Sequence, residues 1–458
     1  MFFKKAIKGH KWITFIILVF LALKIATLHL YKEPWWDPAV YIGMGKYIFS
    51  LGSAGFWEDA RPIAWPIMLG LLWKIGISPI FFGRILDIIF GALVVLLTYK
   101  IGDIIFDRKT ALIASVFMAF SPTFFFFTGI MITETVSTFF TLLAVYFIIT
   151  KRNFLSGLFF GIAFMTRFLQ IFAFISVVFY ILTQQKDKQK ILSKLFLGFA
   201  IAVLPYFILN AFLYQNPIHP FIYHADLTKN SGWDNYHGIS FYFNSLFKEN
   251  IFYLLSIAGI IYVFKNKDKT KKLVVLPLVI FLAFFISIKQ KEMRFLIILM
   301  PYMYLLVSSS LISIFNTKNP KTLLISLIII TFVLSFATAL NYYKNEYSRT
   351  NQYTILQESY DEAKGNLWIS SPMIAAYSDN KASNLVYYPY FDSIKEQELE
   401  NNAGNADYIF IDSCDIGCRP NDSECESKKE ELWNYFAIKL KTEHSSKHGQ
   451  CSQYIFKK

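Results

Sequence analysis

Long apolar runs without a charged residue recur through the first three quarters of the chain. Residues 110–128, 195–214 and 322–340 are three of these runs. Each is about as long as the roughly 20 residues that a helix needs to cross a bilayer. A helix at the surface of a soluble core would instead carry a polar stripe along one face. The pattern therefore predicts an all-α polytopic membrane protein with about eleven transmembrane helices. The predicted spans are 12–31, 80–101, 110–128, 131–150, 155–167, 168–184, 195–214, 250–264, 273–288, 295–315 and 322–340.

Two apolar segments need separate interpretation. Residues 62–78 contain two prolines and Lys74, which favours a helix lying in the membrane interface over a spanning one. Residues 155–184 are long for one span and short for two. A single span would leave Arg167 at the bilayer centre, which is costly. We therefore expect a hairpin of two short helices with Arg167 at its outer turn.

The apolar runs stop after residue 340, where charged residues and asparagine become frequent. Short β-type runs alternate there with helix-like stretches such as 426–437, which predicts a small α/β domain. The strand candidates are 366–370, 384–388, 407–412 and 453–457. We therefore divide the chain into a transmembrane domain, 1–340, which includes a first outer loop at 32–79, and a C-terminal domain, 341–458.

The net charge of +13 would allow a nucleic-acid-binding protein. The basic residues, however, form short clusters between the apolar runs, as the positive-inside rule requires, so we expect no nucleic-acid partner. Lys4, Lys5, Lys8 and Lys11 precede the first span and predict a cytoplasmic N-terminus. An odd number of spans then puts the C-terminal domain outside. The expected location is the cell membrane.

All four cysteines, Cys414, Cys418, Cys425 and Cys451, fall in the C-terminal domain. Their spacing lacks the C-x₂-C knuckle that is typical of zinc sites. In an oxidising outer compartment two disulfides are the better interpretation, and the sequence leaves all three pairings open.

The carboxylates of the membrane region gather at the predicted outer face. Asp37 lies in the first outer loop, Glu134 at the outer start of a span, and Glu292 in an outer turn. A transporter would instead carry its acids near the middle of its helices. Only Lys24 lies well inside a predicted span, without an obvious partner. The pattern favours an enzyme whose lipid substrate presents its headgroup at one face.

Asp37 has two interpretations. As a residue followed by proline, it could simply cap the N-terminus of a helix that stops near Gly52. However, Trp35 and Trp36 precede it at the membrane interface, where an acid is useful if it faces a substrate. Tyr41, one turn further on, would share its face. The second interpretation is a catalytic carboxylate.

The basic residues of the outer face have similar alternatives. Arg61 could place its charge at the lipid headgroups, or it could hold a lipid phosphate. Glu134 could complement a helix N-terminus or act in catalysis. Lys291, Glu292 and Arg294 form a tight turn on the side where basic residues are disfavoured, which indicates an anionic ligand.

Several short motifs occur in an order that resembles the C-type glycosyltransferase superfamily. The greatest likeness is to protein O-mannosyltransferases and the aminoarabinose transferase. In sequence order they are Asp37, ARPIAWP (60–66), GRILD (83–87), FDRKTAL (106–112), SPT (121–123), TE (133–134) and FMTRF (164–168). KQKEMRF, at 289–295, is similar to the His-Lys-Glu-x-Arg-Phe motif of dolichyl-phosphate-mannose-dependent mannosyltransferases, with Gln290 in place of His. Many members have paired acids in the first loop, whereas Pro38 follows Asp37 here. That departure leaves metal use and acceptor type open.

The resemblance implies an inverting glycosyltransferase that moves a mannose-like hexose from a polyprenyl or dolichyl phosphate to an acceptor hydroxyl. Asp37 would be the general base, and Glu134 would be a second catalytic residue that orients the acceptor or assists. No cofactor is required by the sequence. Its partners would be the bilayer, the lipid-linked donor, and an acceptor that is a glycan, a lipid or a protein. The alternatives are a lipid-linked-glycan flippase and an enzyme that transfers whole glycans en bloc. The residues assigned to donor phosphate or sugar are Trp35, Trp36, Tyr41, Arg61, Arg167, Lys291, Glu292 and Arg294.

Overall fold

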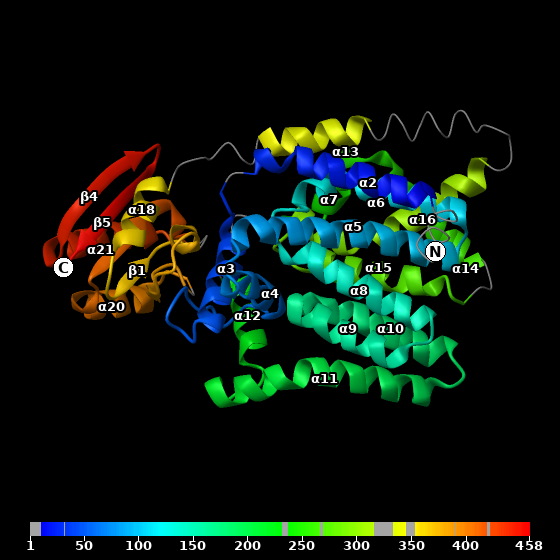
Figure 1. Ribbon diagram of the computed structural model, residues 1–458, viewed down its shortest axis with the longest axis horizontal. Helices are drawn as coiled ribbons and strands as arrows, with labels where there is room; N and C mark the ends of the chain where they lie inside the picture. The colour runs from blue at the N-terminus through cyan, green and yellow to red at the C-terminus, as the bar shows by residue number, and fades with distance from the viewer. Residues whose placement is uncertain are drawn as a thin grey trace. The chain divides into compact units, whose positions relative to one another are not determined.

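The computed structural model describes residues 11–31, 33–230, 237–265, 269–315, 333–344, 353–388, 390–418 and 422–458. It is mostly helical, with one small sheet near the C-terminus, and the chain divides into two compact units (Figure 1). Unit 1 comprises 1–31, 84–209 and 235–348, and unit 2 comprises 32–83, 210–234 and 349–458. The first loop, which we grouped with the membrane helices, thus belongs to the same unit as the C-terminal residues.

The helices of unit 1 run roughly alongside one another (Figure 1). In the described part of the chain, three apolar helices are long enough to cross a membrane: Lys11–Leu30, Pro79–Ile105 and Lys188–Tyr214. Six further apolar helices are shorter, with 10–17 residues each. This architecture confirms an all-α integral membrane protein with a small α/β part, while the eleven crossings stay a prediction. The principal helices are α2 (Lys11–Ala26), α5 (Pro79–Ile105), α6 (Arg108–Phe120), α7 (Pro122–Phe127), α8 (Thr133–Ile149), α9 (Asn153–Thr166), α10 (Ile171–Gln184), α11 (Lys188–Tyr214), α13 (Phe241–Glu249), α14 (Leu255–Lys265), α15 (Lys272–Ser287) and α16 (Met300–Phe315).

Most predicted spans coincide with these helices, and the differences have local causes. The run 110–128 is broken into α6 and α7 at Ser121, whose side chain caps α7, with Pro122 at the first helical position. Proline is favoured there because a backbone N–H in the first turn has no partner within the helix, so its absence costs no hydrogen bond. The predicted last span, 322–340, lies partly outside the described residues, and 333–344 are helical.

The segment 155–184 forms two short helices, as predicted. Helix α9 ends at Thr166, Arg167 is extended with a φ of −154°, and α10 begins at Ile171 after a single 3-10 turn. Glycine allows α9 to approach α11 closely: a Cβ at Gly157 would collide with the carbonyl oxygen of Leu195. The hairpin therefore packs against its neighbour backbone to backbone and leaves Arg167 at its turn.

Unit 2 contains the first loop. It comprises helices α3 (Trp36–Phe49) and α4 (Ala64–Lys74), with α12 (His219–Asn230) and the C-terminal part of the chain. Helix α4 confirms a helix within the predicted interfacial segment. The interpretation of Asp37 as a cap is wrong, because α3 begins one residue earlier and Trp35 occupies the N-cap position. Glycine lets α3 and α4 touch, since a Cβ at Gly45 would lie 2.6 Å from the Pro66 carbonyl oxygen.

The C-terminal sheet has five strands in the order β2-β1-β3-β5-β4. Strand β1 pairs in parallel with β2 and β3, whereas β5 is antiparallel to β3 and β4. Four of the strands overlap the predicted β-type runs, but β2 ends at Leu385, and residues 386–388 of the predicted run 384–388 form a turn. The fifth, β4, was not predicted because its sequence, KTEHSSKH, is entirely polar and largely exposed. The strands are β1 (Leu367–Ile369), β2 (Ala382–Leu385), β3 (Tyr408–Asp412), β4 (Lys441–His448) and β5 (Cys451–Lys457), with helices α18 (Thr354–Glu362), α19 (Pro372–Ala375), α20 (Ser393–Asn402) and α21 (Cys425–Lys439).

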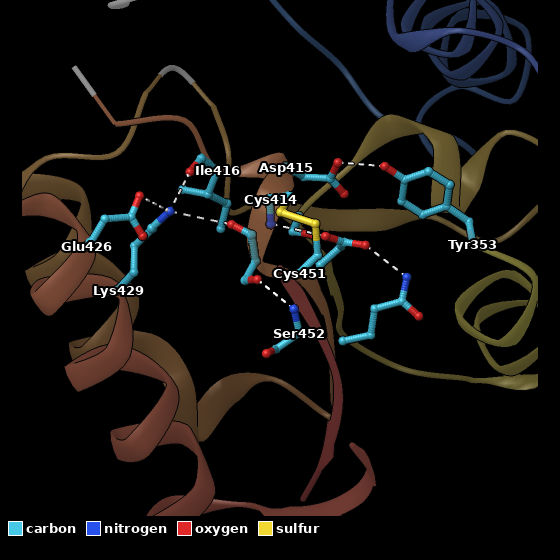
Figure 2. Close-up of a disulfide and its surroundings, with 12 residues drawn as sticks. Tyr353, Cys414, Asp415, Ile416, Glu426, Lys429, Cys451 and Ser452 are labelled. Atoms are coloured by element: carbon cyan, nitrogen blue, oxygen red, sulfur yellow. Dashed lines mark hydrogen bonds and ion pairs between the residues drawn. A yellow bond between two sulfur atoms is a disulfide. The ribbon is translucent and has the colours of Figure 1, made fainter. Parts of the chain in front are cut away.

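Both predicted disulfides are present, as Cys414–Cys451 and Cys418–Cys425. The first joins the end of β3 to the start of β5, and Figure 2 shows it beside a buried polar network. There the Tyr353 hydroxyl donates to Asp415 at 2.6 Å, and Lys429 donates to the Ile416 carbonyl at 3.0 Å. These contacts fix the loop after β3 within unit 2.

Candidate active site

Asp37 and Arg61 meet in unit 2, although they come from different elements. Asp37 lies in the first turn of α3, and Arg61 lies in the loop before α4. The Arg61 Nη1 donates to Asp37 Oδ1 at 2.9 Å, and each side chain is 17 % exposed. Tyr41 is buried one turn after Asp37, with its ring 5.9 Å from the guanidinium. Arg61 thus lies against the face of α3 that Asp37 and Tyr41 were predicted to share.

Glu58 is a second acid on the same guanidinium. Its Oε2 accepts from Arg61 Nε at 3.0 Å, and its Oε1 accepts from the Tyr387 hydroxyl at 2.7 Å. Burial raises the pKa of the Glu58 carboxyl, while the charge of Arg61 and the hydrogen bond from Tyr387 oppose that rise. Tyr387 also presents its ring edge-on to Trp36, with the ring centroids 4.7 Å apart.

The next acid, Asp59, is held in a comparable way. Its Oδ1 accepts from the Tyr388 hydroxyl at 2.6 Å, and its Oδ2 lies 2.8 Å from His219 Nε2. His219, at the start of α12, stacks on Tyr214 with ring centroids 4.4 Å apart. Two consecutive acids of the first loop thus contact two consecutive tyrosines that follow strand β2.

A separate charged cluster forms in unit 1. Glu134, in the first turn of α8, is 1 % exposed and lies 3.1 Å from Arg167 Nη1. Arg294 Nε lies 3.6 Å from the same Glu134 oxygen and 2.6 Å from Glu292. Arg167 also donates to Thr133 at 3.1 Å. Three segments that are distant in sequence thus bring two acids and two arginines together.

The contact that the structure gives for Lys291 is not with a residue of this cluster. It is buried, and its Nζ donates to the carbonyl of Ile288 in its own turn. Of the predicted donor-binding residues in unit 1, Arg167 and Arg294 are therefore joined by ion pairs with Glu134, and Glu292 joins them through its ion pair with Arg294.

Lys24 has the partners that its sequence position did not reveal. It is fully buried in α2 and donates to the Phe125 carbonyl at 2.7 Å and the Tyr343 hydroxyl at 2.8 Å. It also donates to the Tyr31 hydroxyl. The cation that the sequence left without an obvious partner is thus bound by protein oxygens from three other positions in the chain.

The chain is similar to one protein family in part of its sequence and to several solved structures in its fold. A family model described as dolichyl-phosphate-mannose-protein mannosyltransferase matches residues 60–211. The crystal structure of ArnT from Cupriavidus metallidurans bound to undecaprenyl phosphate is similar over 97 % of this chain and 98 % of its own, with a TM-score of 0.69 and 10 % identity. The archaeal oligosaccharyltransferase AglB from Archaeoglobus fulgidus, in complex with an inhibitory peptide and a dolichol-phosphate, has a TM-score of 0.62 at 12 % identity. That likeness covers 89 % of this chain and 70 % of AglB. No curated protein sequence matches the chain.

This chain has the fold of the C-type membrane glycosyltransferases. Arabinofuranosyltransferase AftD from Mycobacteria shares it, with a TM-score of 0.59, 11 % identity, and coverage of 98 % of this chain and 41 % of its own. The resemblance drawn from the order of the motifs is thus confirmed. The matched family segment contains Arg61, Glu134 and Arg167, whereas Asp37 and Arg294 lie outside it.

Within this C-type fold, several residues of the unit 2 cluster were not predicted as site residues. Glu58 and Asp59 are acids of the predicted first outer loop, 32–79, and nothing in their sequence context assigned them a role. Tyr387 and Tyr388 were read only as part of a β-type run. No local feature of NLVYYPY marks them, because the residues that they contact lie 329 positions earlier in the chain.

The described residues include one group of three side chains that lie close enough to hold a metal, Asp412, Cys414 and Cys451. Two of its three donors are the sulfurs of a disulfide, so the group is unsuited to a metal in this state. That the protein requires no cofactor stays a prediction.

Proposed function

We propose that this protein is an inverting glycosyltransferase that moves a mannose-like hexose from a polyprenyl or dolichyl phosphate to an acceptor hydroxyl at the outer membrane face. The observation that carries the proposal is the contact between Asp37 and Arg61. A base for the incoming hydroxyl and a cation for the departing phosphate are the two groups that such a transfer needs.

The chemistry assigns a role to each group. Asp37 removes the proton of the acceptor hydroxyl while that oxygen attacks the anomeric carbon, and the lipid phosphate leaves with the bonding electrons. A phosphate leaves as a stable anion, so no acid has to protonate it. One carboxylate therefore suffices, whereas most glycoside hydrolases need two. Arg61 stabilises the negative charge that develops on the phosphate, because a guanidinium binds phosphate through paired N–H donors.

The donor class is supported by two similarities. The matching family model is described by dolichyl-phosphate-mannose, and the similar ArnT structure is bound to undecaprenyl phosphate. Both lipids have a long polyprenyl chain that carries one phosphate. The apolar helices of this chain suit such a lipid, whose tail stays in the bilayer while its headgroup reaches the polar residues of the loops.

The cluster of unit 1 supplies further candidates for substrate contact. Arg167 and Arg294 are each 16 % exposed and share Glu134. We assign them to the donor sugar or phosphate, and Glu134 to orientation of the acceptor. Trp35 and Trp36 are candidates for stacking on a sugar ring.

The test uses the purified protein in lipid nanodiscs with dolichyl-phosphate-mannose and undecaprenyl-phosphate hexoses, and membrane extracts of the source cells as acceptors. We expect acceptor-dependent release of lipid phosphate, with inversion of the anomeric configuration in the product. Mass spectrometry of lipid-linked glycans and surface glycoproteins from a deletion strain identifies the acceptor. Movement of the intact lipid-linked sugar across a liposome membrane, without bond cleavage, would instead establish the flippase. Transfer of a whole glycan would establish the en bloc enzyme.

A further inference from the structure

Tyr387, in the C-terminal part of the chain, contacts the proposed active site. Tyr387 lies in the turn after β2, and the preceding residue ties this turn to the sheet, because the Val386 N–H donates to the Ile369 carbonyl at 2.9 Å. From there the Tyr387 hydroxyl reaches the first loop and donates to Glu58 at 2.7 Å. The sheet therefore supports a side chain that ends beside Arg61.

The contacts of Glu58 divide between two partners. One oxygen accepts from Tyr387 and the other accepts from Arg61 Nε at 3.0 Å. Arg61 directs its Nη1 to Asp37 at 2.9 Å. A guanidinium is a rigid plane, so fixing its Nε fixes where its Nη atoms point. By binding Nε, Glu58 thus sets the direction in which the Arg61 guanidinium donates to Asp37.

Glu58 is only 1 % exposed, which makes its second hydrogen bond important. A buried carboxylate oxygen without a donor is costly, and the charged form is then disfavoured. The charged and titratable groups near Glu58 include Arg61, Asp37 and Tyr387, with Asp59, Tyr388, His219 and Tyr223 beside them. Among these, Tyr387 supplies the hydrogen bond from the C-terminal part.

We propose that Tyr387 is a positioning residue, through which the C-terminal domain holds Glu58, and thereby Arg61, in the orientation that binds the donor phosphate. The inference rests on the proposed function of Arg61. It gives the C-terminal domain a role in the site itself. Loss of the hydroxyl leaves Glu58 buried with one donor fewer, so the carboxyl keeps its proton to a higher pH and then releases Arg61.

The experiment compares Tyr387→Phe with Tyr353→Phe. Both variants remove a hydroxyl of the C-terminal domain that donates to an acid, but Tyr353 contacts the partly buried Asp415 beside the disulfide, whereas Tyr387 contacts the first loop. Undecaprenyl phosphate is the probe, and its binding to each protein in nanodiscs is measured between about pH 4.5 and 8. Each variant is expressed as a ratio to wild type at each pH, because titration of the phosphate itself is then common to both.

For Tyr387→Phe we expect the acidic loss of binding to move upward by about one to two pH units, the range that a hydrogen bond to a charged group supports. Tyr353→Phe should follow wild type. In a Glu58→Gln background, which cannot titrate, adding Tyr387→Phe should leave the pH profile unchanged. A profile of Tyr387→Phe that follows wild type would overturn the proposal and leave Tyr387 with a purely structural role.

A second measurement does not depend on the donor. Phenylglyoxal modification of Arg61, quantified by peptide mass spectrometry, reports how firmly the guanidinium is held. Tyr387→Phe should raise the Arg61 rate several-fold at acidic pH, while the rate at Arg167 stays at its wild-type value. If wild type fails to bind undecaprenyl phosphate, the proposed donor is wrong, and the Arg61 rate still decides the role of Tyr387. Unchanged labelling of Arg61 overturns it.

Discussion

Arg61 and Asp37 are separated by 24 residues, yet the guanidinium lies 2.9 Å from the carboxylate. Under the proposed function, the base and the cation for the leaving group are therefore held together by the protein before reaction. Such an arrangement lowers the cost of orienting reacting groups and supplies fixed charge where negative charge develops. The contact also makes the two roles separable by mutation, because each side chain can be changed while the other stays.

Asp37→Asn tests the base directly. Asparagine retains an oxygen that can accept from Arg61, so folding and donor binding should stay near wild type, whereas the amide cannot take up the proton. We expect turnover to fall by about 10²–10⁴-fold. Single-turnover transfer and the thermal unfolding temperature are measured on the same preparation. Near-native transfer by this variant would remove Asp37 from catalysis and make Glu134 the next candidate.

Arg61→Ala tests the phosphate contact. It removes a charge-assisted hydrogen bond worth about 1.5–3 kcal/mol, so undecaprenyl phosphate should bind about 10- to 150-fold more weakly. Arg61→Lys is the matched control: it retains the charge but cannot bond Glu58 and Asp37 through one rigid fork, so partial recovery is expected. Isothermal titration in nanodiscs measures both. A change confined to the acceptor requirement would assign Arg61 to the other substrate.

Glu134→Gln tests the cluster of unit 1. The substitution leaves Arg167 and Arg294 with one acid instead of two in a largely buried place, and breaking such a pair costs up to about 3–5 kcal/mol. We expect a lower thermal unfolding temperature, partly restored in the double variant Glu134→Gln/Arg167→Gln. The single variants Glu134→Gln and Arg167→Gln are measured alongside. If the unfolding temperature of the double variant falls by as much as the two single falls added together, Glu134 and Arg167 are not coupled.

The helices were predictable because their signal is local. Charge-free runs and the break at Arg167 follow from the cost of polar groups in lipid, which acts on each segment separately. Most strands of the C-terminal sheet were also predictable from a local signal, because each contains a short β-type run. Strand β4 was not predictable, since its polar sequence is held by pairing with β5 and carries no apolar pattern of its own.

The site was predictable only in part, because its contacts join segments that the sequence keeps apart. Asp37, Arg61 and Glu134 were found from their places in loops and helix starts. The roles of Glu58 and Tyr387 depend on a contact across 329 residues, for which a single sequence contains no signal. The partners of Lys24 were hidden in the same way: Tyr343 lies 319 residues further on.

The orientation in the membrane is testable by labelling single cysteines with an impermeant maleimide. Because all four native cysteines are paired, they need not be removed. Exposed positions are required, and Lys289 and Lys364 on the predicted outer side and Arg108 and Lys188 on the inner side qualify. Cysteine at the first two should react in intact cells, and at the last two only after lysis. Labelling at 188 in intact cells would contradict the predicted membrane sidedness of the 155–184 hairpin.

The two disulfides should differ in what they contribute to stability. Cys414–Cys451 closes a sequence separation of 37 residues and Cys418–Cys425 one of 7. If a disulfide acts mainly by restricting the unfolded chain, the first contributes about 4 kcal/mol and the second about 2 kcal/mol. Paired alanine variants, Cys414→Ala/Cys451→Ala and Cys418→Ala/Cys425→Ala, are compared by thermal unfolding, with peptide mapping of the unreduced protein to establish that the remaining bond is native. We expect the first variant to unfold at the lower temperature, because strands β3 and β5 lose their covalent link while the 7-residue loop stays closed. The reverse order would mean that the small loop supports more of the fold than its length allows, and that its removal disturbs helix α21, where Cys425 is buried.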